Sequence, residues 1–196
     1  MNVKIDLPLA RQEFGFTRTT CGCKKCQVWC KWQPGFLVPS DLERLIPHGE
    51  DPFLWAEEHL RASPGLRIDF GELTVSVPSL VPAKQENGHC HWFQDGQCLV
   101  HANSPYGCAF LDQHLSNKEG ALRCHPARLA RAEAFKDGSL YAQIWQHLEK
   151  KGLTYDTGRT DRERAITAIR KLDKWAMIAE SRKRRKNQRR LRRRAG

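Results

Sequence analysis

Eight cysteines constrain this 196-residue chain more than any other feature of its sequence. Four fall within ten residues and four are spread further along the chain: Cys21, Cys23, Cys26 and Cys30, then Cys90, Cys98, Cys108 and Cys124. Thiolates that lie close together repel one another and oxidise readily unless a soft cation neutralises their charge. The pattern therefore predicts a metal-thiolate site, with all eight cysteines as candidate ligands.

The N-terminal sequence bears on whether these cysteines bind metal or form disulfides. Lys4, Asp6 and Arg11 interrupt the apolar residues there, so the segment lacks the continuous apolar run of a secretory signal. No stretch of the sequence approaches the roughly 18 uninterrupted apolar residues of a membrane span. We therefore expect a cytoplasmic protein, because thiols stay reduced in that compartment. The even cysteine count leaves an exported disulfide framework as the alternative.

The positive charge of the chain is concentrated at its C-terminal end. The formal net charge is +11, and residues 181–196 alone hold ten Lys or Arg and no acidic residue. We expect this basic tail to bind RNA or DNA backbones by counterion release. A solvated extension without a specific partner is the alternative. The candidate contact residues are Arg182, Lys183, Arg184, Arg185, Lys186, Arg189, Arg190, Arg192, Arg193 and Arg194.

Local patterns in the first half predict short helices and hairpins. Residues 21–34 show no clean period, which favours a metal-wrapped loop with a helical turn. Ser40 or Asp41 is suited to cap a short helix, and Asp51 followed by Pro52 is a strong start for the next one. Alternating residues over 66–70 and 73–77 predict a hairpin or two consecutive strands, and an Asp-Gly turn at residues 95–96 predicts a hairpin over 91–101.

The second half of the chain has a helical pattern. Pro126 is suited to open a helix through residues 127–135, because proline is favoured in a first turn. Leu140, Ile144 and Leu148 mark one face of a further helix, and an apolar stripe continues from Thr160. The predicted fold class is α+β: a small metal-stabilised cysteine-cluster domain with short β-hairpins, followed by C-terminal helices and a basic tail. The corresponding segments are an irregular 1–20, a cysteine-cluster domain 21–125, a helical part 126–180 and the tail 181–196.

The order of six cysteines is similar to that of a known family. The motifs are Cys23-x-x-Cys26-x-x-x-Cys30, Gly88-x-Cys90-x-x-Phe93-x-x-x-Gly96-x-Cys98 and Pro105-x-x-Cys108. Over roughly residues 20–112 this order resembles the YkgJ-type cysteine-cluster family, also described as a zinc- or iron-chelating CxxCxxCC domain. Lys31 stands where that family has a second paired cysteine, and Cys21 and Cys124 are the candidate replacements. The resemblance implies bound zinc or iron and carries over no catalytic residue.

The residues leave the type and number of metals open. Cys23-x-x-Cys26 has the spacing that places two sulfurs on one zinc, and Cys90 and Cys98 are suited to supply the other two. An iron-sulfur cluster uses the same thiolate ligands. His89 and His91 flank Cys90, but neighbours in a strand point to opposite faces, so neither is expected to share its metal.

Other chemistry is weakly supported by the sequence. His101 and His114 are as consistent with a surface position as with a ligand role. Helix capping explains Asp41 and Glu43 without assigning them to catalysis. No Ser-His-Asp spacing, phosphate loop or dinucleotide fingerprint occurs, so the sequence assigns no enzymatic activity.

Overall fold

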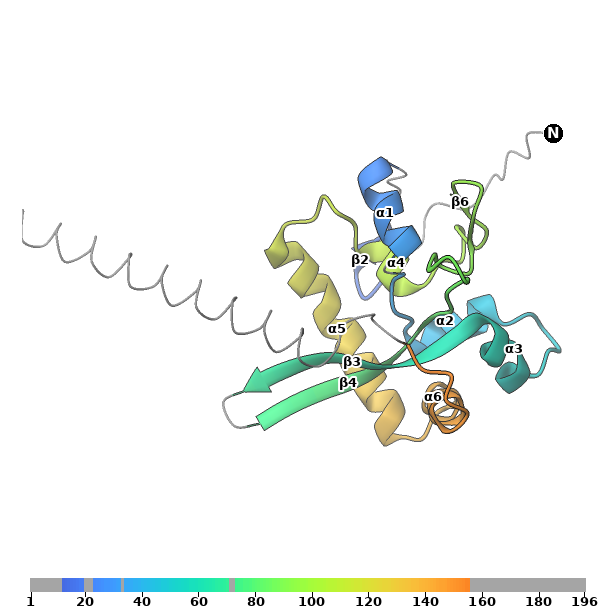
Figure 1. The fold of residues 1–196 in the computed structure, drawn as a ribbon. Helices are drawn as coiled ribbons and strands as arrows, with labels where there is room; N and C mark the ends of the chain where they lie inside the picture. The colour runs from blue at the N-terminus through green and yellow to red at the C-terminus, as the bar shows by residue number, and fades with distance from the viewer. Residues whose placement is uncertain (1–11, 20–22, 33, 71–72, 156–196) are drawn as a thin grey trace, which may run out of the picture. The chain divides into compact units, whose positions relative to one another are not determined.

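A computed structural model describes residues 12–19, 23–32, 34–70 and 73–155 of the chain (Figure 1). Cys21, the stripe predicted from Thr160 and the basic tail 181–196 lie outside the described residues. All described residues belong to one unit, Met1–Tyr155. Within this unit the architecture is α+β, as predicted, and its described strands form two-stranded hairpins rather than one large sheet.

The longest hairpin pairs β3 (Leu60–Phe70) with β4 (Leu73–Pro82) in antiparallel register. The two strands predicted over residues 66–77 are confirmed, but both continue inward past a bulge between Ser63 and Leu66. This inner part is buried: Leu60 and Leu80 have no exposed surface. The hairpin crosses the middle of the unit as a twisted ribbon, and α5 and α6 pack against it (Figure 1).

Two short helices precede this hairpin. Helix α3 (Pro52–His59) starts where predicted, and the Asp51 carboxylate accepts the N–H groups of Phe53 at 2.8 Å and Leu54 at 3.1 Å. Helix α2 (Pro39–Leu45) starts earlier than predicted, with Val38 as its N-cap. Asp41 nevertheless caps this helix, because its carboxylate accepts the Val38 N–H at 2.8 Å from the third helical position.

The first cysteine segment is more regular than predicted. Residues that we expected to form a loop with one helical turn form α1 (Lys24–Trp32). Cys23, Cys26 and Cys30 recur at intervals of three and four residues, and this spacing is also that of one helix face. The spacing that suggested a wrapped metal loop therefore also encoded a helix.

The predicted segments need correction at two places. Helix α5 (Asn117–Lys136) begins at Ser116, whose hydroxyl and Glu119 form a capping box, and Pro126 lies inside it. The predicted boundary between residues 125 and 126 therefore falls within one continuous helix. At the other end of the chain, the hairpin of β1 (Gln12–Glu13) and β2 (Phe16–Thr17) occupies part of the segment predicted to be irregular.

The remaining elements agree closely with the sequence. The hairpin of β5 (Phe93–Gln94) and β6 (Gln97–Cys98) turns through Asp95 and Gly96, both with positive φ. Helix α6 (Leu140–Lys150) buries Ile144 and Leu148 completely, whereas Leu140 is 40% exposed. Tyr141 takes the predicted place of Leu140 on the buried face.

The unit contains two apolar clusters. The larger one lies between the β3–β4 hairpin, α2, α3 and α6. The smaller one surrounds α4 (Tyr106–Phe110) and includes Val38 and Ala127. In the part of the chain that the structure describes, no helix has both the length and the apolar character needed to cross a membrane.

Candidate metal centre

Four cysteines from three separate segments line one cavity of about 350 Å³. Cys26 and Cys30 come from α1, Cys98 from β6 and Cys108 from α4. Cys90 is 5% exposed and lies within electrostatic range of Cys30, Cys98 and Cys108. The fold thus brings five of the eight predicted ligands to this cavity or close to it.

The helical spacing of α1 presents Cys26 and Cys30 on one face, because they lie about one turn apart. The end of the same helix is joined to Cys90: the Cys90 N–H donates to the Lys31 carbonyl at 2.8 Å. Cys98 is held in the short hairpin, where it pairs with Phe93. The first cysteine group and the hairpin cysteines are therefore connected by backbone hydrogen bonds as well as by the cavity.

Two glycines bring Cys108 to the cavity. The Gly35 N–H donates to the Cys108 Sγ at 3.1 Å, and the Gly107 N–H donates to the Phe36 carbonyl at 2.9 Å. The two backbones are so close that a Cβ added to Gly35 would lie 2.2 Å from the Gly107 carbonyl carbon. Only glycine permits this approach, so the contact places the Cys108 thiol with little freedom.

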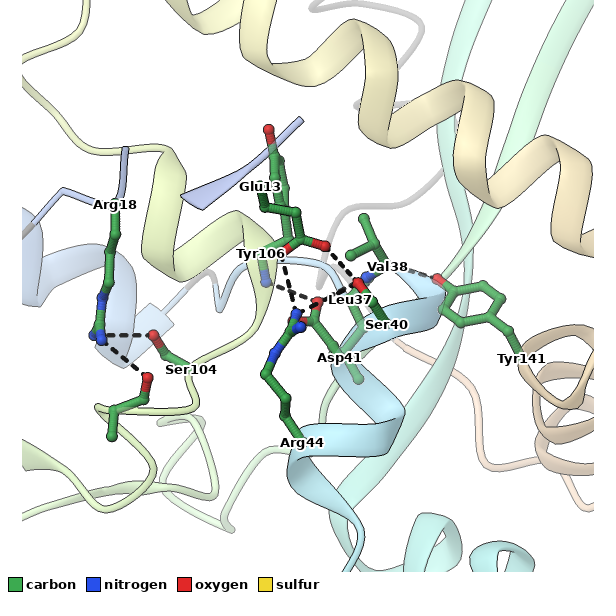
Figure 2. A network of polar contacts seen from close by, with 11 residues as sticks. Glu13, Arg18, Leu37, Val38, Ser40, Asp41, Arg44, Ser104, Tyr106 and Tyr141 are labelled. Atoms are coloured by element: carbon green, nitrogen blue, oxygen red, sulfur yellow. Dashed lines mark hydrogen bonds and ion pairs between the residues drawn. The ribbon is translucent and has the colours of Figure 1, made fainter. Parts of the chain in front are cut away.

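A buried polar network also fixes the start of α4 (Figure 2). Asp41 has no exposed surface, and one of its carboxylate oxygens accepts the N–H groups of Val38 and Tyr106, each at 2.8 Å. Its other oxygen accepts the Arg44 guanidinium at 2.8 Å, and Arg44 also reaches Glu13 at 3.0 Å. Asp41 therefore holds the first residue of the helix that carries Cys108.

A second buried cation supports the loop after Cys98. Arg18 is 5% exposed, and its guanidinium donates to the Ala102 carbonyl at 2.9 Å and to Ser104 Oγ at 3.3 Å, as well as to the His101 carbonyl. Figure 2 shows Arg18 reaching toward Ser104. Its positive charge also acts to lower the pKa of Cys98, although burial has the larger opposite effect.

The protein environment by itself disfavours thiolates in the cavity. Burial raises the pKa of Cys90 to about 12 and that of Cys98 to about 11, and the neighbouring thiols add to both shifts. Burial, followed by repulsion from Cys90, Cys30 and Cys98, also raises the pKa of Cys108. A bound cation reverses this balance, because it deprotonates the thiols that coordinate it.

A second, more compact group of potential ligands includes the first cysteines. The ligand atoms of Cys23, Cys26 and His114 all lie within 4.8 Å of one another, and the Cys23 Sγ is 3.3 Å from the His114 Nε2. These residues form a cysteine and histidine grouping that could hold a metal ion. The sequence left His114 open between a surface position and a ligand role, because its local structure, an Asx turn in which Asp112 accepts the His114 N–H, does not indicate a ligand.

Cys124 lies elsewhere, on α5. Burial raises its pKa, and the charges that act on it come from Arg128 and Arg131. Among the described residues, Cys124 neither lines the cysteine cavity nor belongs to a group of three close ligand atoms.

Comparison with known proteins adds no name to this site: no protein-family model matches the chain, and neither the curated proteins nor the solved structures give a match.

Proposed function

We propose that this protein binds zinc or an iron-sulfur cluster through its clustered cysteines. The observation that carries the proposal is the convergence of Cys26, Cys30, Cys98 and Cys108 on one cavity. Thiolates and imidazoles are the donors that zinc and iron prefer in proteins. The order of the cysteine motifs further supports membership of the YkgJ-type family, and a reducing cytoplasm is the compartment that suits such a site.

The two groups share Cys26 and are alternative sites that favour different ligands. A zinc-sulfur distance of about 2.3 Å separates tetrahedral sulfurs by roughly 3.8 Å, so the compact set of Cys23, Cys26 and His114 suits a single ion. Among the described residues, no three thiols of the cavity have their sulfurs within 4.8 Å of one another, and this wider spacing suits a cluster of several atoms. Zinc would stabilise the fold, whereas a cluster would also supply electron transfer.

Elemental analysis and a visible spectrum of the full chain, purified without oxygen, test the proposal. Stoichiometric iron with broad absorption near roughly 400 nm identifies a cluster, and stoichiometric zinc in a colourless protein identifies zinc. We expect Cys108→Ser to lose most of the metal from the cavity. Cys124→Ser is the matched control that we expect to retain it, because Cys124 lies beside Arg128 and Arg131 instead. Wild-type protein that carries neither iron nor zinc would contradict the proposal.

The sequence also supports a second candidate function, nucleic-acid association through residues 181–196. The support is ten cations without an acidic residue in sixteen positions. We expect deletion of this segment to abolish most binding to a duplex oligonucleotide and to flatten its salt dependence. Lys24→Gln combined with Lys25→Gln is the control, since both residues are exposed on α1. Unchanged affinity of the truncated chain would exclude this function.

A further inference from the structure

Cys90 and His91 are consecutive residues whose side chains join different groups. The Cys90 thiol lies within electrostatic range of Cys30 and Cys98, which line the cysteine cavity, whereas the His91 ring lies against His59. The ligand atoms of Glu58, His59 and His91 all lie within 4.8 Å of one another. A cluster of potential ligands without cysteine therefore lies directly beside the thiol site.

The spacing within this cluster matches that of a coordinated pair of imidazoles. The His59 Nδ1 and His91 Nε2 are 3.0 Å apart. Two nitrogens at about 2.0 to 2.1 Å from a tetrahedral zinc are separated by roughly 3.3 Å, so a small outward movement of the rings admits an ion between them. The Glu58 carboxylate supplies a negatively charged third donor within the same radius.

One buried residue fixes the two histidines relative to each other. Ala83 is 1% exposed; its N–H donates to the His59 carbonyl and its carbonyl accepts the His91 N–H, both at 2.8 Å. His59 is also the last residue of α3, so its position is set by that helix. The pair is thus held by backbone hydrogen bonds that do not depend on the rings themselves.

Aromatic side chains surround the rings on the inner side. The Trp55 ring centroid is 4.7 Å from that of His59, and Trp92 stacks on His59 at 6.2 Å. Burial lowers the pKa of His59, which favours the neutral imidazole that a metal requires. Glu58 is exposed, so an ion has access from solvent.

We propose that Glu58, His59 and His91 form a second metal site, distinct from the cysteine site, for one divalent transition-metal ion such as Zn²⁺. Three protein donors leave one position of a tetrahedral ion for water, as in open zinc sites. Two imidazoles and a carboxylate suit zinc and its neighbours in the first transition row better than Ca²⁺ or Mg²⁺, which prefer oxygen ligands.

Zn²⁺ titration of the full chain, followed by NMR of the ¹⁵N-labelled histidine rings and by metal analysis after dialysis, tests the site. We expect Zn²⁺ to shift the ring nitrogens of His59 and His91 together. We also expect His59→Ala to remove one equivalent of bound zinc, and Glu58→Gln to weaken this equivalent on the order of 10- to 100-fold. Glu58 is exposed, so Glu58→Gln tests the site without removing a buried side chain. His48→Ala is the matched control, because His48 is an exposed histidine outside the group.

The result that overturns the proposal is unchanged zinc stoichiometry and affinity in both Glu58→Gln and His59→Ala. Ring nitrogens of His59 and His91 that do not respond to Zn²⁺ overturn it equally. The cysteine site is read independently by Co²⁺ substitution, since only thiolate ligands give sulfur-to-cobalt charge-transfer absorption. Absence of that absorption from wild-type protein, together with absence of bound iron, would count against the proposed function and leave the histidine site standing.

Discussion

The Asp41 network and the cysteine cavity both include residues of α4, but their polar groups are compensated in different ways. Asp41 is a fully buried charge whose two oxygens accept two N–H groups and a guanidinium from the protein itself. The cavity thiols instead have neighbours of their own kind, and this environment raises the pKa values of Cys90, Cys98 and Cys108. The folded chain itself supplies the hydrogen-bond partners of Asp41, whereas the cavity thiols stay protonated near neutral pH unless they bind a cation.

The largest loss of stability is expected when the Asp41 network is broken. Asp41→Ala removes the acceptor of three hydrogen bonds and leaves the Val38 and Tyr106 N–H groups buried. We expect it to lower the free energy of unfolding by about 3 to 5 kcal/mol in a urea titration. Asp51→Ala also removes a helix cap but at an exposed position, and we expect a loss of about 1 kcal/mol. Equal losses in the two variants would show that the buried network is no stronger than an ordinary cap.

An intermediate loss of stability is expected when the close contact between Gly35 and Gly107 is broken. Gly35→Ala places a Cβ 2.2 Å from the Gly107 backbone, so α4 must move away from Gly35. We expect a loss of about 1 to 3 kcal/mol in thermal or urea unfolding, together with a lower metal content, because Cys108 moves with α4.

The control for this prediction is Gly120→Ala in α5, where an added Cβ meets nothing within 4 Å. Alanine is the better helix former, so this variant is expected to gain about 0.5 to 1 kcal/mol. Wild-type stability and metal content in Gly35→Ala would mean that the close glycine contact does not position Cys108.

The smallest effect on stability near neutral pH is expected from the cavity thiols of the metal-free chain. The pKa values of Cys98 and Cys90 are raised in the folded chain to about 11 and about 12 from an ordinary 9.0. Folding therefore retains protons that the unfolded chain releases, so this stability is complete below pH 9.0 and is lost as the pH rises toward 11 and 12. We expect urea unfolding of the metal-free chain to show this decline, and Cys98→Ser to reduce it.

The metal-loaded chain provides the contrast for the pH experiment. Its coordinating thiols are already ionised, so we expect a nearly constant stability over the same alkaline range. An identical decline in the loaded and the metal-free chain would show that the cavity thiols do not coordinate the metal.

The parts of the fold that the sequence predicted depend on local signals. Asp51-Pro52 and Asp95-Gly96 determine the conformation of the backbone at their own positions. The first pair starts α3 and the second forms the hairpin turn, as predicted. The helix start predicted at Pro126 was wrong. Proline is compatible with a first turn, but here a capping box at Ser116 starts the helix earlier and Pro126 lies inside it. A local rule thus failed where a second local signal competed with it.

The sequence predicted cysteine as the ligand type and part of the grouping. Cysteines of α1 and of the β5–β6 hairpin, which were expected to share one site, line one cavity. The sequence left the role of His114 open and did not indicate the Glu58–His59–His91 cluster, because histidines far apart in sequence become neighbours only through tertiary contacts such as those of Ala83. Arg18 and the Gly35–Gly107 approach were missed for the same reason, since no periodicity marks a residue whose partner is distant.

The hydrogen bonds between the N-terminal segment and residues 101–109 also bear on the order in which the chain is synthesised. Thr19 bonds to the Ala109 carbonyl, 90 residues further along, and Arg18 bonds to residues 101–104. A ribosome that adds 5 to 20 residues per second takes roughly 5 to 20 s to synthesise that distance. The first cysteines therefore leave the ribosome before the segments that enclose them exist, and the cavity that they line is complete only after Cys98 and Cys108 have been synthesised.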